Sequence, residues 1–137
     1  MTQENKELLL KDLCARLPYG VKVEYKNEIF DVEHVSPMYE EVKLDTYETW
    51  TIDVSDIKPY LFPLSRLNSL TDEQKKTLKV LCDWNDEEAD AQSILVLYQK
   101  HFVMKTDVID WLNKNHFDYR GLLDRGLAID ATGLNIY

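Results

Sequence analysis

The run from Gly20 to His34, GVKVEYKNEIFDVEH, alternates apolar and polar side chains on either side of one asparagine. Before the asparagine, valine and tyrosine share one face and lysine and glutamate the other; after it, Phe30, Val32 and His34 share a face. Such alternation is typical of half-buried strands, and Asn27 suits a tight turn. The run therefore predicts a β-hairpin whose apolar face needs a cover, with His34 among the core residues.

The cover is predicted directly upstream, where residues 4–17 have a helical pattern. Its apolar stripe, with members three and four positions apart, consists of Leu10, Leu13, Cys14 and Leu17. Pro18 ends the helix. Because a one-sided sheet and an amphipathic helix bury each other's apolar faces, we expect this helix to pack on the hairpin.

Downstream of the hairpin, Ser36 and Pro37 interrupt the pattern, and alternation returns at residues 42–46 and 50–54. These segments predict two further strands of a small antiparallel sheet. Residues 57–70 then combine two prolines with five leucine or phenylalanine residues. Proline disfavours a helix there, so we expect an extended connector that packs along the core.

The remaining chain is predicted to be helical. A Thr-x-x-Gln capping pattern at 71–74 begins a helix over 72–84, a second helix covers 87–102, and Thr106 caps a third. Asp118 is expected to cap a last short turn that ends at Gly126.

These elements predict an α+β fold that forms a single fused domain over residues 1–137. In it, 1–56 form the N-terminal helix and the antiparallel sheet, 57–70 the packed apolar connector, and 71–137 the helical part. The periodicities place six residues in one common core: Leu13, Val23, Trp50, Ile52, Leu95 and Leu112.

The charge is strongly acidic and unevenly distributed. The chain has 16 basic and 25 acidic residues, a formal charge of −9. Residues 28–56 hold nine acids and one base, Lys43. Affinity for a nucleic-acid backbone rests on Lys and Arg, so direct nucleic-acid binding is disfavoured. Two interpretations stay open: solubility, or a surface that meets a basic partner or imitates a phosphate backbone.

Motifs for catalysis, cofactors and metals are missing from the sequence. Four glycines form no phosphate-binding loop, no serine lies in a nucleophile elbow, and Cys14 and Cys82 are too far apart for a local metal site. His101 and His116 lie near predicted helix ends, where an imidazolium is favoured. We therefore expect no enzyme, no cofactor and no metal site.

The cellular setting is predicted from two features. The first residues do not form a basic and then apolar leader, and the longest later apolar run, Ile94–Tyr98, is far shorter than a membrane span. We expect a cytoplasmic protein without membrane contact. In that compartment Cys14 and Cys82 are expected to be two buried reduced thiols, with a single disulfide as the alternative.

One short segment carries the candidate binding residues, Phe117, Asp118, Tyr119 and Arg120. In the functional interpretation, the Arg120 guanidinium presents a planar set of donors to a carboxylate or phosphate between two rings. In the structural interpretation, Asp118 caps the next turn, the rings pack, and Arg120 pairs with an internal acid. The two interpretations differ in the exposure of Arg120.

Three segments carry a resemblance to known sequences: LCARLPYGV at 13–21, IKPYLFPLS at 57–65, and HFDYRGLL at 116–123 continued by GLAI at 126–129. Together they resemble a family of small uncharacterised proteins from gut Bacteroides-type bacteria and their phages or integrated elements. The resemblance implies a bacterial or phage cytoplasmic setting, often on mobile DNA. That family has no established activity, so it implies no role for any residue.

These observations favour a non-enzymatic protein that acts through protein–protein contacts, with a partner or by self-association. An acidic decoy or anti-defence protein is one alternative. Another is a binder of a small planar ligand or nucleotide, which would use aromatic rings for stacking and arginines for phosphates. The arginines considered for this role are Arg16, Arg66, Arg120 and Arg125.

Overall fold

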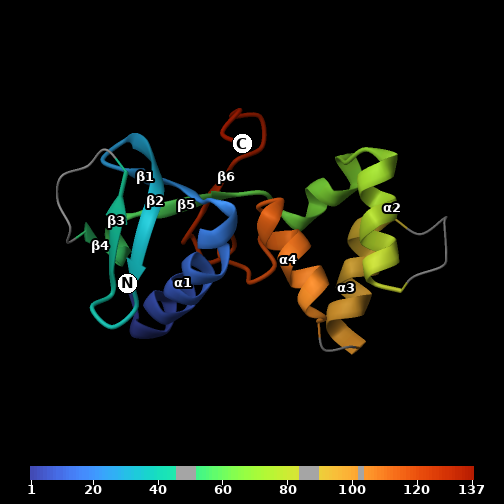
Figure 1. The fold of residues 1–137 in the computed structure, drawn as a ribbon, viewed down its shortest axis with the longest axis horizontal. Coiled ribbons are helices and arrows are strands. Elements are labelled where there is room, and N and C mark those ends of the chain that lie inside the picture. Colours follow the sequence, from blue (N-terminus) through green and yellow to red (C-terminus); the bar gives the residue numbers. More distant parts are fainter. Residues whose placement is uncertain (46–51, 84–89, 102–103) are drawn as a thin grey trace.

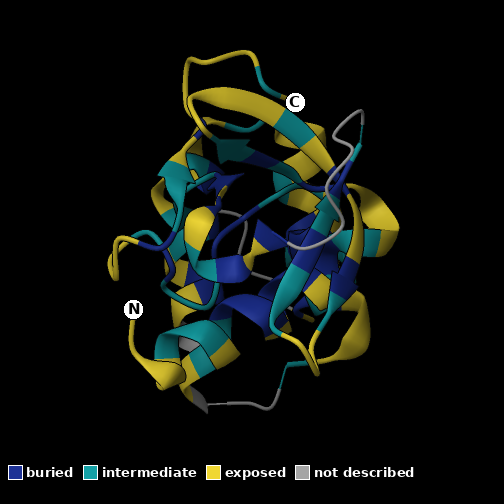
Figure 2. Cartoon of the chain, turned by 90° about the vertical axis from the view of Figure 1, so that its left-hand side faces the viewer, coloured by how far each residue is buried: buried dark blue, intermediate teal, exposed yellow. Residues whose placement is uncertain are grey.

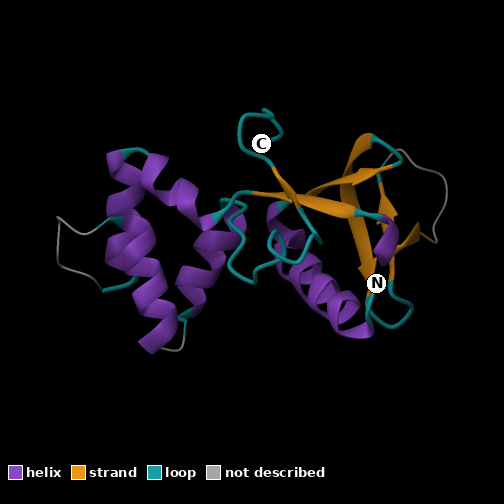
Figure 3. Cartoon of the chain, turned by 180° about the vertical axis from the view of Figure 1, so that it is seen from behind, coloured by secondary structure: helices purple, strands orange, loops and turns teal. Residues whose placement is uncertain are grey.

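The computed structural model describes residues 1–45, 52–83, 90–101 and 104–137. It has the predicted α+β architecture, an N-terminal helix on a mostly antiparallel sheet followed by a helical part. The first helix lies on the strand side of the molecule, and the later helices gather at the opposite end (Figure 3).

The N-terminal helix, α1 (Gln3–Arg16), begins at Thr2, whose side chain accepts a hydrogen bond from the Asn5 amide. Its buried face differs from the predicted stripe, because it consists of Leu9, Leu10, Asp12, Leu13 and Arg16. Cys14 is exposed, so the prediction that both cysteines are buried is wrong for Cys14; both are free thiols, and only Cys82 is buried. A hydropathy pattern does not select charged residues for a core, so the buried pair was missed.

The sheet has the order β4-β3-β2-β1-β5-β6. Its strands are β1 (Lys22–Tyr25), β2 (Glu28–Ser36), β3 (Glu41–Leu44), β4 (Ile52–Asp53), β5 (Lys58–Leu61) and β6 (Ile129–Asp130). All neighbours are antiparallel except β5 and β6. The predicted hairpin is β1–β2, and Lys26 and Asn27 have φ of 49° and 63°, as a tight two-residue turn requires. In Figure 2 the sheet end faces the viewer, with buried residues in its interior.

A β-bulge in β2 corrects the prediction for His34. Val32 pairs with Leu44, whereas His34 pairs with Lys43, so one residue of β2 is additional at this point. An extra residue reverses the faces of those that follow. His34 is therefore exposed, and Val35 is buried in its place.

The apolar connector is packed, as predicted, and part of it is also a strand. Residues 58–61 form β5, which pairs with β1 on one side and β6 on the other. The 3-10 helix η3 (Leu64–Ser69) follows and leads into α2 (Asp72–Leu81). Ile57 and Leu61 are fully buried and Tyr60 is 6% exposed. Part of the segment predicted as an extended connector along the core is thus an interior strand of the sheet.

The helical part contains α2, α3 (Ala91–His101) and α4 (Thr106–Lys114). The predicted capping box is present, with Thr71 and Gln74 bonded reciprocally. The expected cap of α4 is displaced by one position, since Lys105 is the N-cap residue and Thr106 is the first helical residue. Asp90, which accepts hydrogen bonds from the amide and hydroxyl of Ser93, stabilises the start of α3.

In the parts of the chain that the structure describes, buried apolar residues form two clusters instead of the single predicted core. Leu13, Val23 and Ile52 belong to the cluster between α1 and the sheet, whereas Leu95 and Leu112 belong to the cluster among the helices. Trp50, the sixth predicted member, lies outside the described residues.

The end of the chain returns to the sheet (Figure 1). Leu122 and Leu127 pack in the cluster of α1 and the sheet, and β6 pairs with β5. Along the chain, the helices α2, α3 and α4 therefore lie between β5 and a final segment that packs with the sheet.

Candidate functional site

The predicted site at 117–120 lies where the helical part meets α1. Phe117 is 1% exposed and stacks on Trp111, with ring centroids 5.8 Å apart. The Asp118 carboxylate accepts hydrogen bonds from the Leu122 and Leu123 amides, at 3.0 and 2.9 Å. Asp118 thus caps the following turn, as the structural interpretation expected.

Arg120 is engaged by an internal carboxylate. Its Nη1 donates to Asp12 Oδ1 at 2.9 Å, and its side chain is 15% exposed. The other oxygen of Asp12 accepts from Arg16 Nε at 2.8 Å. Both guanidinium groups lie over the ring of Tyr119, at 4.5 Å for Arg120 and 5.4 Å for Arg16. The open set of donors predicted for Arg120 is therefore not found, and these residues connect α1 to the end of α4.

Beside this network lies a pocket of about 480 Å³ between η3, the start of α2, the end of α4 and the last residue of the chain. Two main-chain hydrogen bonds hold its walls together: Phe62 N donates to His116 O at 2.8 Å, and Asp118 N donates to Phe62 O at 2.9 Å. Its volume is within the range of pockets that bind small molecules.

The charged residues of the pocket are Arg66 and Lys114. The Arg66 guanidinium carbon lies 4.0 Å from the centroid of the Phe62 ring. Neither cation forms an ion pair with a described residue, and no acidic side chain is among the described residues that line the pocket. In a chain with nine more acids than bases, the described side chains that line this concave surface thus include two cations and no carboxylate.

The four arginines considered for phosphate binding differ in whether a carboxylate lies against the guanidinium group. Arg16 and Arg120 share Asp12, and Arg125 lies 3.5 Å from Glu4 and donates to Asn5 at 3.0 Å. Arg66 is the member of that set whose guanidinium has no carboxylate partner among the described residues.

His116 and Tyr137 form one wall of the pocket. Their rings stack at 3.5 Å between centroids with an interplanar angle of 8°. The Tyr137 hydroxyl donates to Tyr60 O at 2.8 Å and accepts from Lys22 N at 3.0 Å. His116 adopts a positive φ of 65°, and its buried Nδ1 has no hydrogen-bond partner.

Burial determines the protonation of this pair. Desolvation, aided by Arg16 and Lys22, lowers the pKa of His116 to about 4, so the imidazole is neutral at pH 7. Burial likewise raises the pKa of Tyr137 to about 12, although the hydrogen bond from Lys22 opposes this shift. The expectation that His116 favours the imidazolium form is therefore wrong, because desolvation outweighs any benefit from the helix end.

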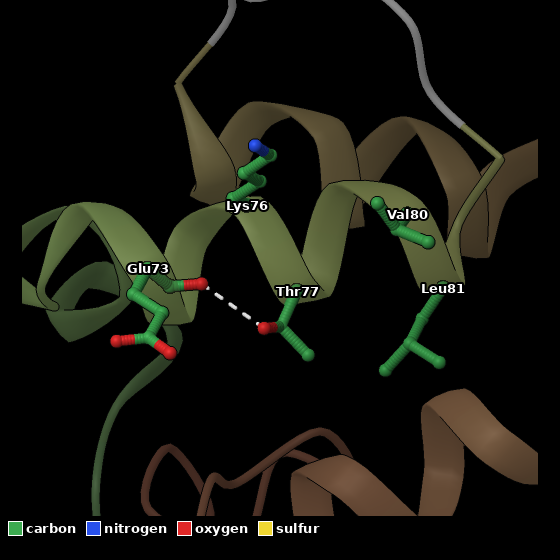
Figure 4. Close-up of a pocket in the computed structure, with 5 residues that line it drawn as sticks. All are labelled: Glu73, Lys76, Thr77, Val80 and Leu81. Carbon is green, nitrogen blue, oxygen red and sulfur yellow. Dashed lines mark hydrogen bonds between the residues drawn. The ribbon is translucent and has the colours of Figure 1, made fainter.

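A second hollow, of about 420 Å³, lies along α2 and is lined by Glu73, Lys76, Thr77, Val80 and Leu81 (Figure 4). The Thr77 hydroxyl donates to the main-chain carbonyl of Glu73 at 3.0 Å. All five residues come from one helix, and the hollow brings no groups from distant segments together.

The turn between β2 and β3 is the most exposed apolar feature among the described residues. Met38 is 83% exposed and Tyr39 is 70% exposed. The turn is held at its base, because Glu40 N donates to Pro37 O at 3.3 Å and Val54 N donates to Glu40 O at 2.9 Å. The Gln3 side chain also donates to the Glu40 carboxylate at 3.3 Å, which connects the turn to the start of α1.

The acidic surface of the sheet is partly neutralised. Three of its carboxylates pair with lysines: Asp31 with Lys22, Glu33 with Lys43, and Asp53 with Lys6. The pKa of Asp53 is lowered mainly by hydrogen bonds from Ser55. These pairs reduce the resemblance to a row of phosphates.

Sequence reasoning missed the pocket for a clear reason. Its two cations are 48 positions apart and belong to different helical segments, so no local motif joins them. The available signal was Arg66 in an apolar connector, four positions after the aromatic Phe62.

No helix in the described parts of the chain is long and apolar enough to cross a membrane, and no group of three or more metal-ligating side chains was found there. In comparisons with known proteins, no family model, no curated protein and no solved structure matches this chain.

Proposed function

We propose that this protein acts without catalysis, by binding a basic protein partner through the β2–β3 turn. The observation that carries the proposal is the presentation of Met38 and Tyr39, 83% and 70% exposed, on a turn fixed at its base. Methionine and aromatic side chains are enriched at the centres of protein interfaces. A turn that is already ordered loses little conformational entropy on binding.

The charge around this turn specifies the partner. Glu40 and Glu41 follow the two apolar residues directly, and Lys43 is the single base between residues 28 and 56. An apolar anchor with an acidic rim complements an apolar pocket with a basic rim, and opposite potentials accelerate association. Two copies of the chain would oppose like charges at this surface, which disfavours self-association through it.

The proposed setting is the cytoplasm of a gut bacterium, with the protein encoded by the bacterium or by its phage. The resemblance of residues 13–21, 57–65 and 116–129 to small proteins of such bacteria and mobile elements supports it. The acidic decoy is the less supported alternative, because Asp31, Glu33 and Asp53 are already paired with lysines.

The test is affinity capture from a Bacteroides lysate, with the bound proteins identified by mass spectrometry. Met38→Gln/Tyr39→Gln is compared with Val80→Gln/Val96→Gln, which changes two exposed apolar residues of the helical part. We expect the wild type and the control to capture a basic protein that the turn variant does not capture. Added salt should release this protein from the wild type. If the turn variant and the control retain the same proteins, the proposal is wrong. A wild-type dimer that only the turn variant abolishes would make self-association the function.

A further inference from the structure

We propose that the pocket between η3, α2, α4 and the last residue is a binding site for a small organic phosphate with a planar ring, of mononucleotide size. This site is separate from the β2–β3 turn and does not depend on the function proposed for it. Three observations lead to this inference: the cavity, its charge and its aromatic walls.

The charge selects an anion. Arg66 and Lys114 project from two segments onto one cavity, and no described carboxylate neutralises either of them. Several other surface lysines, such as Lys11 and Lys58, also form no ion pair with a described residue, so it is the convergence of Arg66 and Lys114 on one concave surface that points to a ligand. A guanidinium provides paired donors and an ammonium a point charge, a combination suited to phosphate oxygens. Lys114 also lies in the last turn of α4, where a cation is favourable, so its position alone would not indicate a ligand.

Arg66 is oriented for this role by Phe62. The guanidinium carbon lies 4.0 Å from the centroid of that ring, a cation–π contact that restricts a long side chain. Its edge donors remain available, because stacking on a ring uses only the face of the guanidinium group. The arginine is thus ordered before any ligand arrives, and binding costs less side-chain entropy.

The start of α2 lies at the same rim. Thr71 and Gln74 line the pocket and close the capping box of this ten-residue helix. The positive end of a helix favours an anion nearby. This feature adds to the two cations and could not indicate a site without them.

His116 lines the same pocket through its exposed atoms. Its unpartnered Nδ1 is sealed from solvent, so that atom offers no hydrogen bond to a ligand in the pocket. The volume of about 480 Å³ exceeds what inorganic phosphate needs, so a phosphate carried on a larger group fills more of the pocket.

Aromatic rings favour a planar group on the ligand. Phe62 and Tyr137 line the cavity, whereas Phe117, which is 1% exposed, offers no open ring surface. Tyr137 remains 40% exposed although its ring stacks on His116. A heterocyclic ring can pack against such a surface, and stacking on aromatic side chains does not require a particular base.

Calorimetry with the full chain tests the inference, using adenosine monophosphate, ribose phosphate, adenosine and inorganic phosphate as probes. We expect adenosine monophosphate to bind, ribose phosphate to bind at least tenfold more weakly, and adenosine and inorganic phosphate to bind more weakly still. Binding should weaken as salt rises, since both cations are accessible to solvent.

Paired variants locate the site. Arg66→Gln/Lys114→Gln should weaken the binding of adenosine monophosphate at least tenfold. Lys11→Gln/Lys58→Gln removes the same charge from exposed positions of α1 and β5 and should leave this affinity unchanged. Chemical-shift changes on ligand addition should map to the amides of Phe62, Arg66 and His116. The inference is overturned if adenosine monophosphate does not bind, or if both double variants weaken its binding equally. These results leave the turn proposal unaffected, because capture by the β2–β3 turn is measured with different variants.

Discussion

Arg16 Nη2 donates a hydrogen bond of 2.6 Å to the main-chain carbonyl of Phe117, 101 positions later in the chain. Arg16 is fully buried and lies in α1, and Phe117 belongs to the cluster among the helices. This contact therefore joins the two clusters of buried residues through a polar group. Its neighbours Asp12 and Arg120 make the junction a network in which one carboxylate serves two arginines.

Removing Asp12 tests this junction. Asp12→Ala leaves the buried Arg16 without its carboxylate, and an unpaired buried charge typically costs about 3–5 kcal/mol. We expect the free energy of unfolding in urea to fall by about that amount. Glu7→Ala, on the exposed side of the same helix, is the control and should change it by less than about 0.5 kcal/mol. Equal effects of the two substitutions would show that the network contributes little.

The helical cluster is tested at Leu95, which is fully buried in α3. Leu95→Ala removes apolar contacts and leaves a cavity, so we expect a loss of about 2–5 kcal/mol in the free energy of unfolding. Val96, the next residue, is 48% exposed, and Val96→Ala should cost far less. Unfolding followed by circular dichroism and by tryptophan fluorescence should give the same transition, since the Arg16–Phe117 contact couples the two clusters. Separate transitions by the two probes would contradict this coupling.

The hairpin was predictable from residues 20–34 and the helix that packs on it from residues 4–17, because alternation, helical spacing and a tight turn are local signals. The bulge at β2 was not predictable, since it depends on pairing with β3 across the sheet. Strand β6 was missed for the same reason: two residues, Ile129 and Asp130, have no periodicity to detect, and their partner β5 is nearly 70 positions away.

The site illustrates the same limit for charged residues. A sequence shows that Asp12 and Arg16 are four positions apart, which suits a helical ion pair. It does not show that α4 and the following turn cover this pair completely. The sequence left open whether Arg120 presents free donors or pairs with an internal acid. Tertiary packing pairs it with Asp12 and leaves Arg66 without a carboxylate partner among the described residues.

The stability of the protein should depend on pH through His116. Its folded pKa of about 4 is lower than the ordinary value of 6.5, so the unfolded state binds a proton first as the pH falls. The stability that comes from keeping His116 neutral is fully present above pH 6.5, and it is lost as the pH falls from about 6.5 to 4. Because the ring keeps some solvent access, we expect a loss of about 1–2 kcal/mol.

His116→Asn isolates this contribution, since asparagine tolerates the positive φ at this position. Urea unfolding of both proteins at pH 7, 5.5 and 4.5 is the measurement. Carboxylates titrate in both proteins, so the difference between the two pH profiles reports His116. We expect the wild type to lose more stability between pH 7 and 4.5 than the variant. Parallel profiles would show that His116 has a normal pKa in the folded state.

The last prediction concerns the contacts that Tyr137 makes with His116 and β5. Tyr137→Phe keeps the stacked ring and removes the hydroxyl that bridges Tyr60 O and Lys22 N, so we expect a loss of about 1 kcal/mol in the free energy of unfolding. Tyr137→Ala also removes the ring that covers His116. Because desolvation is the main cause of the low pKa of His116, uncovering the imidazole should raise that pKa toward 6.5.

A proton NMR titration of His116 separates these two effects of Tyr137. The Phe variant should retain a His116 pKa near the wild-type value, because the ring still excludes water from the imidazole. The Ala variant should show a pKa raised by at least one unit. If the Ala variant leaves the pKa of His116 unchanged, the neighbouring cations Arg16 and Lys22, and not the stacked ring, keep the imidazole neutral.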